Sequence, residues 1–108
     1  MKLRKNYEFR NVYKNGGYYA DRFLVLYAVK NNLNVSRFGI SAGKKVGKSV
    51  VRNRVTRLIR EAIRRNVSKI KPGRDIIILA RAGSGEISLA AAEESLAYLI
   101  NKSRLNVT

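Results

Sequence analysis

The sequence contains neither histidine nor cysteine. Without these residues the chain has no serine–histidine–aspartate or cysteine–histidine catalytic group, no imidazole or thiolate metal site, and no disulfide bond. The absence of cysteine also fits a reducing compartment, and we predict a cytoplasmic location.

Acidic residues are scarce as well. Seven Asp and Glu stand against 23 Lys and Arg, which gives a formal net charge of +16. The acids show no spaced carboxylate cluster of the kind that two-metal nucleases use, so we predict no catalytic residue and no metal site in the chain. A compact chain with this charge repels itself, and a polyanion is the partner that would neutralise it.

Long apolar runs are also missing. The apolar runs at 23–29 and 76–80 are far shorter than the ~20 residues of a membrane-spanning helix, so we predict strands there and no membrane association. The charged N-terminus lacks the apolar segment of a secretory signal. With 108 residues and 45% hydrophobic content, the chain should form a single domain, 1–108, around one core.

The pattern of apolar and turn-forming residues predicts an α+β sandwich, with helices packed against one sheet. We expect a helix at 6–14, one long strand at 18–29, a strand at 37–42, a basic helix after the loop 43–48, a strand at 75–81, and a last helix after Ser88. Ser49 and Ser88 are the predicted N-caps of the two later helices. Both faces of the strand at 18–29 are apolar, so either both are covered or one is left for a ligand.

The segment 44–65 carries nine cationic side chains and one acid, Glu61. Its apolar residues recur at the three- and four-residue spacing of a buried helix face: Val51, Val55, Leu58, Ile59, Ala62 and Ile63. Asn53, Arg57, Arg60 and Arg64 then point away from that face, and Arg52 and Arg54 lie at its two sides. A solvated helix with ion pairs from Glu61 to Arg57 and Arg65 is the alternative. One acid cannot balance nine cations, so we favour a phosphate-binding surface.

The loop 43–49 approaches the nucleotide-binding pattern G-x-x-x-x-G-K-[ST], with a strand before it and a helix after it. Its spacing is one residue short, and Ala42 stands where the first glycine belongs. We therefore predict no ATP or GTP site and no small-molecule substrate. The free N–H groups at the start of the helix would still favour a phosphate.

Apolar and aromatic side chains also gather in the first helix and first strand. Phe9, Tyr13, Phe23, Val25 and Tyr27 form this group. Composition alone favours a core role for them. The functional alternative is a groove in which unpaired bases lie on aromatic faces.

Three groups of residues, in this order, resemble the signature of the bacterial ribonuclease P protein subunit. They are Lys44-Lys45-Val46-Gly47, Val50-Val51-Arg52-Asn53-Arg54-Val55 and Arg57-Leu58-Ile59-Arg60-Glu61. Further matches are Phe9, Val12, Tyr13, Lys14 and Gly16 with the family's first helix, and 22–27, 37–41 and 75–78 with three of its strands. The resemblance covers nearly the whole chain.

This resemblance implies a holoenzyme in which a large RNA is the catalyst and the chain is its protein cofactor. The holoenzyme removes the 5′ leader of precursor tRNA by hydrolysing one phosphodiester bond, with Mg²⁺ held mainly by the RNA. The residues expected to contact the catalytic RNA are Lys44, Lys45, Lys48, Arg52, Asn53, Arg54, Arg57 and Arg60. Those expected to line a cleft for the single-stranded leader are Phe9, Tyr13, Val25 and Tyr27, which reverses the preference for a core role. Phe23 is left as core or cleft rim.

The resemblance also implies a fold like domain 2 of ribosomal protein S5, in the order helix-strand-strand-(strand)-helix-strand-helix. Its βαβ crossover around the basic helix would be left-handed, against the usual right-handed rule. In one departure, Thr56 stands where the family often has lysine, which leaves any role of position 56 open.

Two other classes of function are weighed against this one. Composition does not separate it from a structural RNA-binding protein, such as a ribosomal protein, but the aromatic groove and the ordered signature favour ribonuclease P. A DNA-binding regulator is weaker, because no helix-turn-helix pair precedes the basic helix.

Overall fold

A computed structural model describes residues 2–107 of the chain. Within these residues the helices and strands are, in order, α1 (Asn6–Asn15), β1 (Gly17–Ala20), β2 (Leu24–Lys30), β3 (Arg37–Ala42), η1 (Lys44–Val46), α2 (Ser49–Asn66), η2 (Val67–Lys69), β4 (Arg74–Ala80), η3 (Ala82–Ser84) and α3 (Leu89–Lys102). The strands form one sheet in the order β1-β2-β4-β3. The β1–β2 and β2–β4 pairs are antiparallel, whereas β3 and β4, joined through α2, are parallel. The predicted α+β class is confirmed.

The main core lies between the sheet and the two later helices. Four side chains point from the sheet into this core and are buried there: Leu24 and Leu26 of β2, and Ile76 and Ile78 of β4. The helices contribute Val55, Ile59, Ala62 and Ile63 from α2, and Ala92, Leu96 and Leu99 from α3. The apolar face predicted for the basic helix is therefore the face that packs on the sheet.

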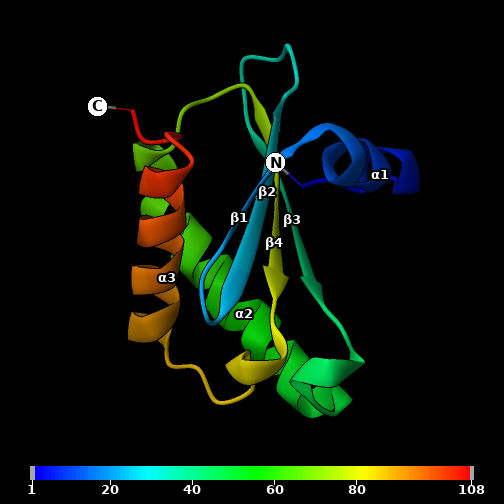
Figure 1. The fold of residues 1–108 in the computed structure, drawn as a ribbon, viewed down its shortest axis with the longest axis vertical. Helices are drawn as coiled ribbons and strands as arrows, with labels where there is room; N and C mark the ends of the chain where they lie inside the picture. Colours follow the sequence, from blue (N-terminus) through cyan, green and yellow to red (C-terminus); the bar gives the residue numbers. More distant parts are fainter. Residues whose placement is uncertain (1, 108) are drawn as a thin grey trace.

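The opposite face of the sheet is only partly covered. Figure 1 shows α1 on the other side of the sheet from α3. Val12 of α1 forms a small second core with Leu3 and Ile77, and Tyr27 and Val29 pack against it. On this face of β2, Val25 is buried and Tyr27 and Val29 are half-buried. The second apolar face of the strand is thus covered at Val25 and partly covered at Tyr27 and Val29.

The single strand predicted at 18–29 is wrong, because this segment forms the hairpin of β1 and β2. The turn is made by Asp21, whose carboxylate oxygen Oδ1 accepts hydrogen bonds from the backbone N–H groups of Phe23 and Leu24, each at 2.9 Å. Such a local side-chain turn lets an apolar run reverse without glycine or proline. The hairpin places Tyr18 directly opposite Tyr27.

Replacing Asp21 with alanine should lower the free energy of unfolding by about 2 kcal/mol, since hydrogen bonds to a charged group contribute about 1.5–3 kcal/mol each and Asp21 is partly solvated. Oδ2 also accepts a hydrogen bond from the Ser95 hydroxyl of α3. Burial alone would raise the pKa of Asp21, but the hydrogen bonds from Ser95, Leu24 and Phe23 hold it below its usual value. Urea denaturation measures the loss. Asp21→Asn keeps one acceptor and should lose less than alanine; equal stability of all three proteins would rule out this role.

The two predicted serine caps behave differently. Ser88 caps α3, and its hydroxyl accepts a hydrogen bond from the Ala91 N–H at 3.1 Å, as predicted. Ser49 is not a cap, because α2 already begins at this residue and its side chain makes no capping bond. Gly47, at φ +150°, turns the chain into the helix one residue earlier than predicted. A side chain at that φ would be strained, and its Cβ would meet Val51 at 3.0 Å.

Candidate nucleic-acid interface

The eight residues predicted to contact a large RNA lie on η1, at the residue before α2 and on the first two-thirds of α2, and we call them the basic surface. They are Lys44, Lys45, Lys48, Arg52, Asn53, Arg54, Arg57 and Arg60. All except Arg52 are exposed. Among the described residues, no hydrogen bond or ion pair engages the side chains of Lys44, Lys45, Lys48, Asn53, Arg57 and Arg60. Their charge is therefore left for an external anion.

The acids near α2 neutralise positive charge only at its C-terminal end. Glu61 accepts a hydrogen bond from Arg64 Nε at 2.7 Å and from Arg65 Nε at 3.1 Å. The bonds from Arg64 and then Arg65 lower the pKa of Glu61 to about 2. Arg65 also reaches Glu93 of α3, at 3.3 Å. The expected pair of Glu61 with Arg65 is present, but the pair with Arg57 is not, so Arg57 stays on the unpaired part of the helix.

The two arginines of the Arg52-Asn53-Arg54 segment have different surroundings. Arg54 donates hydrogen bonds to the backbone carbonyl oxygens of Gly85, at 3.0 Å, and Ile87, at 2.7 Å. Its guanidinium therefore holds the loop before α3 against α2. Arg52 is half-buried, and its Nε is buried without a hydrogen-bond partner. A buried N–H group without an acceptor is unfavourable. Of the two arginines, Arg52 is therefore the one whose hydrogen-bonding capacity is not satisfied within the protein.

The N-terminus of α2 adds a second feature that favours anions. Lys48, the residue before the helix, makes no side-chain cap, and the first turn contains no acid. The first N–H groups of an uncapped helix point along the axis and carry partial positive charge. Lys44, Lys45 and Lys48 surround this end. The start of α2 can therefore attract an anion without the residue spacing of a nucleotide-binding loop.

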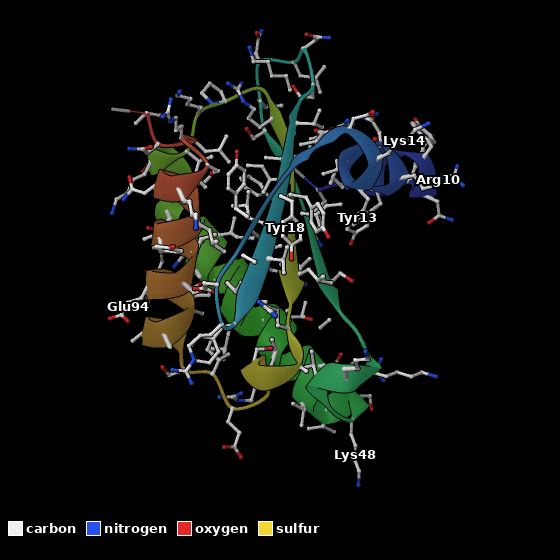
Figure 2. All side chains as sticks on the ribbon, viewed as in Figure 1. Arg10, Tyr13, Lys14, Tyr18, Lys48 and Glu94 are labelled. Atoms are coloured by element: carbon white, nitrogen blue, oxygen red, sulfur yellow. The ribbon has the colours of Figure 1, made fainter. Side chains whose placement is uncertain are left out.

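Three tyrosines form a cluster between α1 and the sheet, which we call the tyrosine cluster. The ring centroids of Tyr13 and Tyr27 are 4.9 Å apart, and those of Tyr18 and Tyr27 are 5.3 Å apart, both edge to face. Tyr13 is 40% exposed and Tyr18 60% exposed. Figure 2 shows Tyr13 and Tyr18 projecting into the same space, with Arg10 and Lys14 on the outer side of α1 and Lys48 at a distant end of the molecule.

The environment of Tyr27 keeps its hydroxyl protonated. Burial, together with the neighbouring Tyr18 and Tyr13, raises the pKa of Tyr27 above its usual value of 10.0. The phenol is therefore a neutral hydrogen-bond donor throughout the physiological range, placed among aromatic faces. That combination suits an unpaired base, which offers both a flat surface and polar edges.

The other residues predicted to line this cleft contribute less surface. Val25 lies on the same face of β2 as Tyr27 but is only 4% exposed, so it offers little surface to a ligand. Phe9 is half-buried and packs on Gly39, where an added Cβ would lie 2.5 Å from Cε1 of the ring. Phe23 packs against the main core, and Arg22 lies over its ring at 4.7 Å. Of the two roles left open for Phe23, the structure favours the core.

An ion network fixes α1 over the sheet. Arg37 of β3 donates to Asp75 of β4 through Nε at 2.9 Å and Nη2 at 2.6 Å, and to Glu8 of α1 through Nη1 at 2.5 Å. The other oxygen of Glu8 accepts the N–H groups of Arg4 and Lys5 and closes the first turn of α1. The network therefore sets where α1 stands, and with it the position of Tyr13.

Residues 2–107 lack two other kinds of feature. No helix in this range is both long and apolar enough to cross a membrane. No group of three or more His, Cys, Asp or Glu side chains comes together there in a way that could hold a metal ion.

Comparison with known proteins assigns the family. The sequence model of the family Ribonuclease P matches residues 1–104. The chain is 44% identical to the ribonuclease P protein component of Clostridioides difficile (strain 630), over 97% of this chain and 93% of that protein. It is 49% identical to that of Clostridium botulinum (strain Loch Maree), over 94% of this chain and 92% of that protein.

Solved structures agree with the sequence matches. The Staphylococcus aureus RNase P protein superposes with a TM-score of 0.88 at 32% identity, covering 97% of this chain and 96% of that one. The Thermotoga maritima RNase P protein gives a TM-score of 0.85 at 29% identity, covering 94% and 96%. These matches favour ribonuclease P over the ribosomal and DNA-binding alternatives. The chain belongs to the ribonuclease P protein family.

Proposed function

We propose that the chain is the protein cofactor of a ribonuclease P holoenzyme, with its basic surface on the catalytic RNA and its tyrosine cluster on the 5′ leader of precursor tRNA. The observation that carries this proposal is the separation of the two surfaces. One is cationic, exposed except at Arg52 and unpaired except at Arg54, and the other is aromatic and lies between α1 and the sheet. Two surfaces of different chemistry suit two RNA partners.

The basic surface would act on phosphates. Lysine and arginine contacts release counterions from RNA, so binding should be strongly salt-dependent. The uncapped start of α2 adds backbone N–H donors. Placing these charges between two polyanions would lower their mutual repulsion, which raises the affinity for substrate and relaxes the requirement for Mg²⁺.

The tyrosine cluster would hold the unpaired leader. Stacking of a base on an aromatic side chain contributes about 1–3 kcal/mol and tolerates different bases. Tyr18, which the sequence did not single out, joins Tyr13 and Tyr27 as the most exposed of the three rings. Val25 remains a predicted contact with little surface to offer.

The proposed chemistry needs no protein nucleophile. The holoenzyme hydrolyses one phosphodiester bond to give the mature 5′ end of tRNA, and the RNA subunit is the catalyst, with Mg²⁺ held mainly by RNA. Three of the seven acids are already engaged by arginine, since Glu8 and Asp75 are bound to Arg37 and Glu61 to Arg64. We also propose a cytoplasmic location, a single domain, and the left-handed crossover of the domain 2-like fold of ribosomal protein S5.

Replacing Tyr27 with alanine should weaken holoenzyme binding to precursor tRNA about tenfold, the loss expected for one stacked base. Binding to mature tRNA, which has no leader, should be unchanged. Fluorescence titration of both RNAs with the reconstituted holoenzyme gives the two dissociation constants. Tyr27→Phe keeps the ring and should retain most of the affinity.

Tyr98→Ala is the matched control. Tyr98 is a 49% exposed tyrosine on α3, outside both proposed surfaces, and its removal should leave both affinities unchanged. If Tyr27→Ala weakens precursor and mature tRNA equally, the tyrosine cluster is a structural feature and the leader is bound elsewhere.

A further inference from the structure

A pocket of about 430 Å³ opens between α2 and the outer edge of β3, apart from the tyrosine cluster. Its walls are mostly apolar, with Phe38 and Ile40 from β3, Ile63 from α2, Val67 from η2, and Phe9 from α1. Pockets of this size and composition accept small flat ligands.

The rim of the pocket is cationic. Lys2, Arg60 and Arg64 line it together with the Thr56 side chain, and no acid does. Arg64 is paired with Glu61, whereas Arg60 has no partner among the described residues. An apolar interior with a cationic rim selects a ligand that is flat in one part and anionic in another.

The pocket continues into the basic surface. A second hollow of about 300 Å³ is lined by Asn53, Thr56, Arg57 and Arg60, so the two hollows share Thr56 and Arg60. A polyanion bound along α2 would therefore pass the mouth of the pocket. Thr56 is half-buried and lines both hollows.

The edge strand adds polar groups to one wall. The Phe38 carbonyl accepts the Leu3 N–H at 2.9 Å, so the backbone groups of Phe38 point away from β4. Backbone direction alternates along a strand, so Ile40, two residues later, directs its N–H and C=O the same way. A planar ligand in the pocket would meet a donor and an acceptor beside an apolar surface.

We propose that this pocket receives an unpaired nucleobase of the catalytic RNA, flipped out of the RNA strand that lies along α2. The inference rests on the proposed function of the basic surface, and it assigns a ligand to the pocket that adjoins this surface at Arg60. The base would pack against Phe38, and its flanking phosphates would lie on Arg60 and Arg57. A nucleotide unites the flat apolar part and the anionic part that the pocket and its rim require.

Two substitutions fill the pocket from opposite sides without changing its charge. Thr56→Trp enters from α2, and Val67→Trp enters from η2, where the native side chain is exposed. Thr56→Val keeps the volume of threonine and is the control. Circular dichroism melting establishes that each variant is folded, and a misfolded one is replaced by the other.

The measurement is chemical probing of the catalytic RNA in the reconstituted holoenzyme. Dimethyl sulfate reports base accessibility, and hydroxyl radicals report backbone protection. At least one unpaired base should be protected by the wild-type protein and by Thr56→Val, and its reactivity should rise at least threefold in each tryptophan variant that is folded. Backbone protection should persist, while RNA affinity falls about tenfold through loss of one stacked base.

The outcomes separate this inference from the proposed function. Base protection that is identical in the wild-type and tryptophan holoenzymes would overturn the pocket assignment alone. Lost protection located in the precursor leader would overturn the choice of the catalytic RNA. Absence of any backbone protection by the wild-type protein would refute the basic surface as an RNA-binding site, and the pocket assignment with it.

Discussion

Replacing Arg52, Arg57 and Arg60 together with glutamine should weaken binding of the catalytic RNA by at least about 1,000-fold at low salt. Charge-assisted hydrogen bonds contribute about 1.5–3 kcal/mol each, and three of them are lost. None of the three guanidinium groups makes an ion pair or hydrogen bond within the described residues, so their loss costs no internal contact. The variant should therefore fold normally and fail in binding.

The salt dependence tests whether these contacts are to phosphates. The slope of log K against log salt should become shallower by about 0.7–0.9 for each lost contact, or roughly 2–3 in all. Filter binding at four or more salt concentrations measures it. The control is a triple variant with the same change in net charge, in which Lys30, Lys69 and Lys102, all exposed and outside the basic surface, become glutamine. Equal loss in both variants would show that only total charge matters.

Replacing Asp75 with alanine should lower the free energy of unfolding by about 3 kcal/mol, because removing one partner of a buried ion pair leaves the other uncompensated. Asp75 is 2% exposed and accepts hydrogen bonds from Arg37 and from Asn31 Nδ2, the latter at 2.8 Å. For a chain of this length the melting temperature should fall by roughly 10–20 °C. Scanning calorimetry measures it.

The same carboxylate should make stability depend on pH in the acid range. Burial would raise the pKa of Asp75, but the hydrogen bonds from Arg37 and Asn31 hold it below its usual value of 3.8. A carboxylate with a lowered pKa in the folded state adds stability above its unfolded pKa and loses it as the pH falls through the folded pKa. The wild-type protein should therefore lose stability below about pH 4, and Asp75→Ala should lose less over that interval.

Glu61→Gln is the control for this prediction. Glu61 also has a lowered pKa, about 2, but its partners Arg64 and Arg65 are exposed. Exposed ion pairs contribute little, so this change should alter the melting temperature far less than Asp75→Ala. Similar shifts for the two variants would contradict a special role for the Arg37 network.

The position of α1 connects this network to function. Arg37 joins Asp75 in the sheet to Glu8 in the first turn of α1, and α1 carries Tyr13. If the Asp75 carboxylate is lost from this network, Arg37 and α1 can shift, and Tyr13 would then move relative to Tyr27 even in a protein that remains folded. Leader binding should therefore suffer in Asp75→Ala at temperatures below its melting transition.

Several features were predictable from the sequence because they depend on local spacing. The apolar residues of α2 recur with helical period, and this fixed both its buried face and the exposure of Asn53, Arg57 and Arg60. The Ser88 cap was predictable for the same reason, since a cap acts within three residues of the chain. The family resemblance rested on the same local groups of residues.

Other features could not be predicted from local spacing, because they depend on where the chain reverses direction. The apolar pattern of 18–29 predicts one strand, and in one strand Tyr18 and Tyr27 would stand far apart. The hairpin instead pairs them directly. The signal available in the sequence was the polar pair Asp21-Arg22 inside an otherwise apolar run, because an aspartate carboxylate can accept the N–H groups two and three residues later.

The sequence by itself determined the net charge, the amphipathic basic helix, the α+β class and the family, because composition and short-range periodicity are properties of the chain alone. Only the tertiary structure decided which charges stay free. It bound Arg54 to the carbonyls of Gly85 and Ile87, paired Glu61 with Arg64, and left Arg57 and Arg60 unpaired. It also assembled three tyrosines from three elements. Apart from the pair of Glu61 with Arg64 within α2, these are contacts between segments distant in sequence, and packing sets them through distances that no local pattern encodes.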